Sequence, residues 1–223
     1  MTRKYSLILG NLGNTNDRFC GGYKDNPDTR EMLRQACEVP HVEGIELVGT
    51  WDVTPESASE MKAMLDDRGK TCVSIIPDLF ADKRFWKGSY GAPDADVRQY
   101  AVDYTKRMCD VAGELGCPLL NIWPGQDGFD YLLAADHMEH RDRFRDGIRE
   151  VAEAYPDLRF ALEYKPKEPR CFSTLARMGD TLLMVNEIDC DNVGVCIDTG
   201  HSYVAGESVG EAIVLAARAG GGY

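Results

Sequence analysis

Six short apolar runs, each followed by a longer amphipathic segment, are the feature that most constrains the fold of this chain. The runs are rich in Val, Ile and Leu, which is typical of strands in a parallel sheet covered on both faces. They predict strands at residues 5–11, 44–49, 71–77, 118–124, 159–164 and 193–198. The segments after them predict helices at about 28–38, 54–68, 95–116, 139–154, 174–188 and 208–219. Six strand–helix units in order indicate an α/β fold with right-handed crossovers.

Two parallel architectures fit this order. An open doubly wound sheet often carries a glycine-rich phosphate loop, but "LGNLGN" at 9–14 is only loosely like one and lacks its third glycine. A (β/α)₈ TIM barrel instead places its chemistry at the carboxyl ends of many strands. Polar and aromatic residues follow nearly every predicted strand, which favours the barrel: Asn11 and Asn14; Thr50, Trp51 and Asp52; Asp78; Trp123, Gln126 and Asp127; Glu163 and Lys165; Asp198 and His201.

A complete barrel has eight strands, and residues 1–223 account for six. We therefore expect a single TIM-barrel domain that lacks strands seven and eight, in a partial sequence whose natural product continues beyond Tyr223. An open arc of six strands exposes two unpaired edges, which promote association. The 223-residue chain is accordingly expected to bind metal weakly, to show little turnover and to aggregate or pair.

Composition excludes several classes of protein. The net charge is −12 with a pI of about 4.8, and an acidic surface repels nucleic acid. No apolar run approaches the length of about 18 residues that a membrane span needs. The eight cysteines form no CxxC pair, which indicates free thiols in a reducing, cytoplasmic setting.

The segment "ALEYKPKEPR" at 161–170 ends the fifth strand with two charged residues, Glu163 and Lys165. Their spacing of two places both on one face of a strand, toward the barrel mouth. A buried carboxylate requires a cation, a metal or hydrogen bonds, so a site and a structural Glu163–Lys165 ion pair are both open. Pro166 and Pro169 stiffen the loop that follows.

The segment "CIDTGHSYVAG" at 196–206 places Asp198 and His201 after the sixth strand. Gly200 between them permits a tight turn, so the two side chains can face one centre. Together with Glu163 they form an oxygen and nitrogen ligand set that suits Mn, Mg or Co, with Zn less favoured. The alternatives are a helix-capping or core role for His201 and an N-cap role for Asp198.

The segment "NIWPGQDGFDY" at 121–131 follows the fourth strand. Trp123 offers a flat apolar face that suits the C–H face of a sugar, and Gln126 and Asp127 can bind hydroxyl groups. The alternative is an ordinary turn with one core aromatic residue, because Pro-Gly and Asp-Gly dipeptides mark turns in any context.

These segments resemble, in the same order, xylose isomerase and the wider superfamily of xylose isomerase-like TIM-barrel sugar isomerases and epimerases. "LEYKPKEPR" is similar to that enzyme's strand-five motif, "DTGHSYVAG" to its strand-six motif with Asp198 replacing Glu, and "WPGQDG" to its Trp-Gly-Gly-Arg-Glu-Gly turn. The resemblance is clearest over residues 78–206.

The resemblance implies a divalent-metal-dependent isomerase or epimerase that acts on a keto-sugar, or between aldose and ketose, through a metal-stabilised enediolate. It implies Glu163 and Asp198 as metal ligands, His201 as a ligand or substrate contact, and Trp123 as a pocket wall. Lys165 would hold a substrate oxygen and, with Glu163, form the catalytic pair. The expected partner is a small sugar, and the full-length form is expected to be a homo-oligomer.

Two departures move the expected substrate away from xylose. The histidine with which xylose isomerase assists ring opening has no counterpart in "IELVGTWDV", and Gln126–Asp127 replaces an Arg-Glu pair. A ketose epimerase-like enzyme is favoured. The alternatives are a C-glycoside-cleaving lyase of the same superfamily and an inactive sugar-binding barrel. Zinc endonucleases acting at abasic DNA share the architecture, but the net charge of −12 and the four histidines argue against them.

Overall fold

The computed structural model describes residues 4–13, 15, 24–25, 28–131, 133–168 and 171–219. The predictions that concern Asn14, Cys20 and Pro169 lie outside these residues. The seven cysteines that are described are all free thiols, as the sequence predicts. In the described part of the chain, no helix combines the length and the apolar character needed to cross a membrane.

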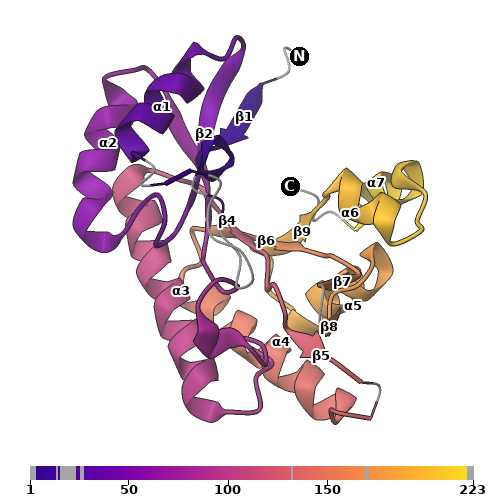
Figure 1. The fold of residues 1–223 in the computed structure, drawn as a ribbon. Helices are drawn as coiled ribbons and strands as arrows, with labels where there is room; N and C mark the ends of the chain where they lie inside the picture. Colours follow the sequence, from indigo (N-terminus) through magenta and orange to yellow (C-terminus); the bar gives the residue numbers. More distant parts are fainter. Residues whose placement is uncertain are drawn as a thin grey trace.

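The centre of the molecule is a six-stranded sheet in which every pairing is parallel. Each predicted apolar run supplies one strand, and the spatial order follows the chain order, as in a TIM barrel (Figure 1). The fold prediction is thus confirmed for six strand–helix units. The strands are β1 (Tyr5–Ile8), β2 (Val42–Val48), β3 (Thr71–Ile76), β4 (Leu119–Ile122), β6 (Arg159–Glu163) and β9 (Val193–Cys196).

Helices cover the outer face of this sheet (Figure 1). Several begin where the sequence places a capping residue: the Asp28, Asp94 and Asp136 side chains each accept a backbone N–H from the first turn. Thr54 and Pro55 begin a helical segment as predicted, but its first turn is a 3₁₀ helix. The helices are α1 (Thr29–Glu38), η2 (Pro55–Ser57), α2 (Ala58–Asp66), η3 (Lys83–Phe85), α3 (Ala95–Leu115), α4 (His137–Ala154), α5 (Met178–Ile188) and α7 (Val209–Arg218).

The first strand is shorter than predicted. It ends at Ile8, and η1 (Leu9–Leu12) forms a 3₁₀ turn in place of the rest of the expected strand. The turn closes with the N–H of Gly13 donating to the carbonyl of Gly10 at 3.0 Å. Gly13 has a φ of 145°, a value that glycine adopts readily and other residues rarely do.

A second, antiparallel sheet was not predicted. It comprises β5 (Gly128–Phe129), β8 (Cys171–Ser173) and β7 (Lys167–Glu168), in that order. Its strands have two or three residues, too few to show a period in the sequence. The sheet joins the loop after β4 to the loop after β6. A short helix, α6 (Thr199–Val204), was also missed; it begins directly after Asp198.

Two apolar clusters fill the interior. The larger one packs the sheet against its helices and includes Ile45, Leu47, Ile75, Phe144 and Leu162, all fully or almost fully buried. The smaller one lies near the carboxyl ends of the strands. Its members are Val48, Ile76 and Phe80, with Ile8, Trp51, Ala81 and Trp123 packed against them. The smaller cluster therefore gives one end of the sheet an apolar floor.

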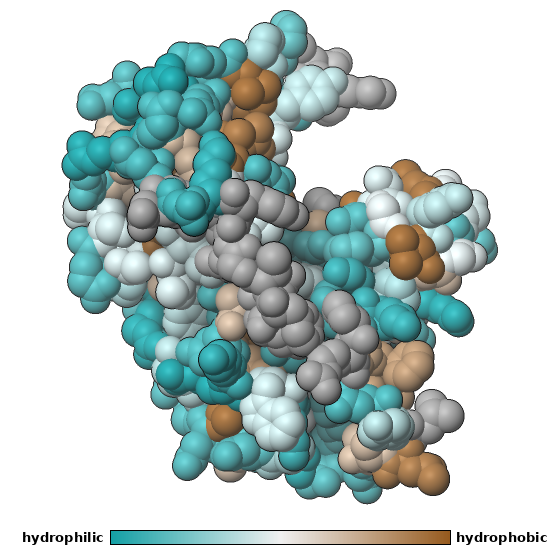
Figure 2. Space-filling view, viewed as in Figure 1, coloured by the Kyte–Doolittle hydropathy of each residue, from teal (hydrophilic) through white to brown (hydrophobic). Residues whose placement is uncertain are grey.

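Most of the coloured residues on the face seen in Figure 2 are hydrophilic. This face is notched between the end of the molecule that carries β1 and β2 and the end that carries α6 and α7 (Figures 1 and 2). Helices α6 and α7 carry exposed apolar side chains: Tyr203, Val204, Ile213, Val214 and Leu215.

Candidate functional site

A pocket of about 340 Å³ opens at the carboxyl ends of the parallel strands. One part of its lining is apolar and another part carries charge and a histidine. This is the edge at which barrel chemistry is expected. The lining residues are Ile8, Gly10, Asn11, Thr15, Val48, Trp51, Ile76, Phe80, Trp123, Glu163, Lys165, Glu168, Asp198 and His201. All five site residues inferred from the sequence are therefore in one pocket.

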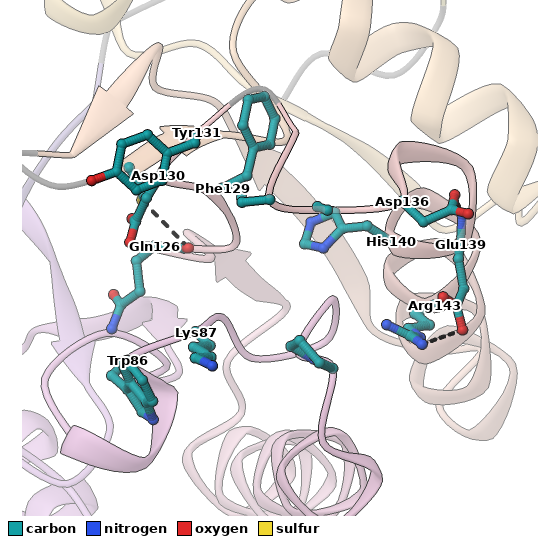
Figure 3. Close-up of a pocket in the computed structure, with 15 residues that line it drawn as sticks. Trp86, Lys87, Gln126, Phe129, Asp130, Tyr131, Asp136, Glu139, His140 and Arg143 are labelled. Carbon is teal, nitrogen blue, oxygen red and sulfur yellow. Dashed lines mark hydrogen bonds and ion pairs between the residues drawn. The ribbon is translucent and has the colours of Figure 1, made fainter.

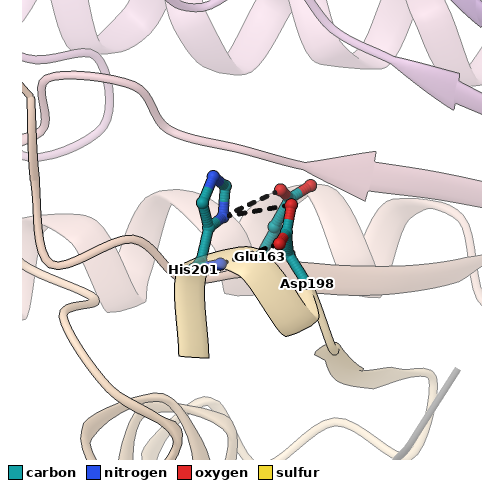
Figure 4. Close-up of side chains that lie close together, drawn as sticks. All are labelled: Glu163, Asp198 and His201. Carbon is teal, nitrogen blue, oxygen red and sulfur yellow. Dashed lines mark hydrogen bonds and ion pairs between the residues drawn. The ribbon is translucent and has the colours of Figure 1, made fainter. Parts of the chain in front are cut away.

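Glu163, Asp198 and His201 converge on one point of this pocket (Figure 4). Glu163 is the last residue of β6, and Asp198 and His201 flank the start of α6. Nδ1 of His201 lies 3.2 Å from Oε1 of Glu163 and 3.5 Å from Oδ2 of Asp198. One ligand atom from each residue lies within 4.8 Å of the other two. Two neighbouring βα units thus build the cluster.

Asp198 has two roles at once. Its Oδ1 accepts the backbone N–H of His201 at 2.8 Å and so caps α6, which is the N-cap alternative considered from the sequence. Its other oxygen, Oδ2, faces the imidazole of the same residue. The cap fixes the first turn of α6 and thereby holds His201 beside Glu163.

Asn121 positions Glu163 and was missed by the sequence analysis. Its Nδ2 donates a hydrogen bond of 2.6 Å to Oε2 of Glu163 from the adjacent strand β4. Asn121 is a buried polar residue inside the apolar run "LLNIW". A polar residue in a buried strand requires a hydrogen-bond partner, and this feature of the sequence could have identified Asn121. The bond occupies Oε2, so Oε1 is the oxygen that faces His201.

The three residues fit a divalent cation. Nδ1 of His201 is buried and makes no hydrogen bond of good geometry, although two carboxylates face it. Burial acts to lower the pKa of His201, but Glu163 and Asp198 outweigh it and raise that pKa above its ordinary value. The site thus favours positive charge. Two carboxylates and one imidazole are ligands that Mn, Mg, Co and Zn accept.

Lys165 does not pair with Glu163, so that alternative is wrong. Its Nζ lies 2.7 Å from Oε1 of Glu168, the first carboxylate of the loop that follows. It also lies 5.2 Å from the centre of the Trp123 ring, a cation–π distance. The backbone leaves the strand at Glu163, and the N–H of Lys165 donates to the carbonyl of Leu175. Lys165 therefore lies in the pocket beside the cluster, with its charge balanced by Glu168.

An aromatic wall lines the apolar part of the pocket. The rings of Trp51 and Phe80 meet edge to face at 5.4 Å, and those of Phe80 and Trp123 lie 4.5 Å apart. The indole N–H of Trp51 donates to Oδ2 of Asp78 at 2.8 Å, which fixes that ring. Trp123 is thus a pocket residue, as inferred from the sequence. Phe80 is a second residue of the aromatic wall, which the sequence did not predict.

Gln126 and Asp127 do not line this pocket, which corrects the expectation that they lie beside Trp123 and bind its ligand. Asp127 is fully buried, and its carboxylate accepts backbone N–H groups from Ser89, Tyr90 and Gly91. Asp127 therefore ties the loop after β4 to the segment before α3. Gln126 faces a different pocket, which is described below.

The fold and the pocket together define a barrel-type protein with an acid and histidine cluster at its strand ends. The chain belongs to the xylose isomerase-like TIM-barrel family, because the model of that family matches residues 30–221. The resemblance inferred from the sequence is confirmed.

Solved structures of the same fold include enzymes of different activity. The D-psicose 3-epimerase of Clostridium cellulolyticum H10, solved with D-tagatose, superposes with a TM-score of 0.74 at 18% identity, over 96% of this chain and 70% of that one. The probable 3-DHS dehydratase of petrobactin synthesis from Bacillus anthracis gives 0.68 at 18% identity, over 97% and 70%. A structure of the IOLI protein with a bound zinc atom gives 0.66 at 18% identity, over 95% and 68%. At these identities the likeness establishes the shared fold.

Proposed function

We propose that this chain carries the site of a divalent-metal-dependent sugar isomerase or epimerase that acts on a keto-sugar. The observation that carries the proposal is the convergence of Glu163, Asp198 and His201 within 4.8 Å, beside an aromatic wall and a lysine. Membership of the family, and neighbours that include D-psicose 3-epimerases, support the same chemistry.

The cation would be held by Glu163, Asp198 and His201. When bound, a divalent ion supplies positive charge that polarises a substrate carbonyl and offsets the negative charge of an enediolate. Mn, Mg and Co are the favoured ions, and Zn also accepts this ligand set.

The chain's own groups would orient the sugar and move its proton. The aromatic wall of Trp51, Phe80 and Trp123 would pack on the C–H face of the sugar and exclude water from it. Nζ of Lys165 would donate a hydrogen bond to a substrate oxygen. Glu163, whose carboxylate is oriented by the bond from Asn121, would accept the proton from the carbon next to the carbonyl.

Binding and proton exchange test this proposal without relying on full turnover. The chain is titrated with Mn²⁺, then with D-fructose, D-psicose and D-tagatose, by calorimetry. Sugar NMR in deuterated water then follows the hydrogen next to the carbonyl. We expect sugar binding that depends on the cation and deuterium uptake at that carbon. Tight binding to duplex DNA with an abasic site, together with no response to any keto-sugar, would overturn the proposal.

A further inference from the structure

Figure 3 shows a second pocket, of about 460 Å³. The segment before α3, the loop after β4 and the first turns of α4 form its walls. It has no lining residue in common with the pocket that contains Glu163. Its rim carries two well-exposed aromatic side chains: Trp86, exposed by 68%, and Tyr131, exposed by 76%.

Gln126 supplies this pocket with a buried amide that has no partner. The residue is 3% exposed, and neither Nε2 nor Oε1 makes a hydrogen bond. A buried amide without a partner is costly, and native proteins rarely leave one without a reason. Gln126 is one of the residues that line the pocket, and a ligand that reaches its amide would supply the missing hydrogen-bond partners.

The backbone on both sides of that amide is held firmly. The Cys171 thiol donates to the carbonyl of Gln126 at 3.4 Å. The neighbouring Asp127 accepts three backbone N–H groups from residues 89–91. Gly128 pairs with Ser173, and a Cβ at Gly128 would lie 1.8 Å from the carbonyl oxygen of Phe172, so only glycine fits. The backbone that carries the Gln126 side chain is therefore held in place.

Several charged groups around the pocket already have partners. Arg143 is ion-paired with Glu139, Asp136 caps α4, and Nζ of Lys87 lies 4.5 Å from the centre of the Trp86 ring. These contacts, and the exposed carboxylate of Asp130 in the same lining, disfavour an anionic ligand. A neutral ligand with a flat apolar face, and with groups that both donate and accept hydrogen bonds, matches the aromatic rim and the amide.

We propose that this second pocket binds a neutral saccharide, with two adjacent hydroxyls on the Gln126 amide and its C–H faces against the exposed rings of both Trp86 and Tyr131. Each hydroxyl both donates and accepts, so a vicinal pair satisfies Nε2 and Oε1 together. The site is separate from the proposed metal cluster and does not depend on its activity.

Fluorine NMR distinguishes the two pockets, because the chain has three tryptophans and only Trp86 lines the second one. The full chain is labelled with fluorotryptophan, and the resonances are assigned with single Trp→Phe variants. Methyl glucoside, methyl galactoside and cellobiose are then titrated without added metal. We expect at least one of them to shift the Trp86 resonance.

Matched variants test the role of the amide. Gln126→Leu should weaken that binding by about tenfold or more, whereas Gln99→Leu, which alters an exposed glutamine on α3, should not. Tyr131→Ala changes an exposed ring and provides a second variant should Gln126→Leu not fold.

Three outcomes overturn the proposal. One is a Trp86 resonance that no saccharide moves at millimolar concentration. Another is an equal response in the wild-type chain and in a folded Gln126→Leu chain, or, where that variant does not fold, in Tyr131→Ala. The third is a response to acetamide or uracil but to no saccharide, which would assign the pocket to planar amides instead.

Discussion

Nδ1 of His201 lies 3.2 Å from Oε1 of Glu163, although the two residues belong to different βα units. Asp198 approaches the same nitrogen at 3.5 Å. Negative charge is thereby concentrated around one imidazole at a largely buried position. Such an arrangement is stabilised by positive charge, which either a proton or a divalent cation can supply.

Glu163→Gln should weaken Mn²⁺ binding by about tenfold or more, roughly 1.4 kcal/mol, because it removes one charge at nearly constant shape. Calorimetric titration measures the affinity, and circular dichroism checks the fold. Glu150→Gln, at an exposed position paired with Lys106, is the matched control and should bind as the wild type does. Equal affinity in both variants would remove Glu163 from the ligand set.

Asn121→Leu should also weaken Mn²⁺ binding, but through Glu163. The change removes the hydrogen-bond donor to Oε2 of Glu163. Leaving a buried acceptor without its hydrogen bond costs about 1–3 kcal/mol of free energy. A double-mutant cycle checks the route: in a Glu163→Gln background the effect of Asn121→Leu on affinity should be small. A full effect in that background would show that Asn121 acts elsewhere.

Lys165→Met should weaken keto-sugar binding by about tenfold while leaving Mn²⁺ binding largely intact, because Lys165 pairs with Glu168 rather than with Glu163. Lys167→Met is the control, since Lys167 is exposed on β7 and does not line the pocket. Sugar titrations of the two Mn²⁺-loaded variants make the comparison. Unchanged sugar affinity in Lys165→Met would assign this lysine to loop structure alone.

The sequence predicted the elements that local pattern encodes. Continuous apolar runs and capping residues such as Asp94 yielded the six parallel strands and most helices. The polar residues at the ends of successive strands predicted a shared site for Glu163, Asp198 and His201, and these three residues line one pocket. This succeeded because parallel strands bring their carboxyl ends to the same edge of a sheet.

What the sequence did not predict depends on contacts between distant residues. The pairing of Lys165 with Glu168 follows from the turn that the chain makes after Glu163. The burial of Asp127 follows from its contacts with residues 89–91, almost forty positions earlier. The short antiparallel sheet around Gly128 has too few residues per strand to leave a pattern.

Asp127→Asn should lower the free energy of unfolding by about 3 kcal/mol. The substitution removes the charge that strengthens the hydrogen bonds from three backbone N–H groups, and it turns the NH₂ group of asparagine toward those same donors. Urea unfolding measures the change. Asp130→Asn, an exposed neighbour in the same loop, should change stability by less than about 0.5 kcal/mol. Similar stability in both variants would show that the carboxylate charge is unimportant at position 127.

Stability should fall with acidification below a pH of about 6.5 because of His140. Burial lowers the pKa of this histidine below its ordinary value of 6.5, and the nearby Asp127 only partly opposes that effect. The folded state therefore binds a proton less readily than the unfolded state does. Above the pKa of His140 in the unfolded state, the neutral imidazole makes its full contribution to the free energy of unfolding. As the pH falls from that pKa toward the lower pKa of the folded state, this contribution is lost, by at most about 1.4 kcal/mol per pH unit.

His140→Gln tests this dependence. The substitution removes the titration and retains a polar group that can reach Thr174, whose hydroxyl bonds Nε2 of His140 at 2.5 Å. Urea unfolding of the wild type across this pH range should show a steeper loss of stability on acidification than His140→Gln does. His137→Gln, at an exposed position one turn earlier on α4, should keep the wild-type slope. If the free energy of unfolding falls equally with pH in all three proteins, the titration of His140 does not cause the loss of stability in acid.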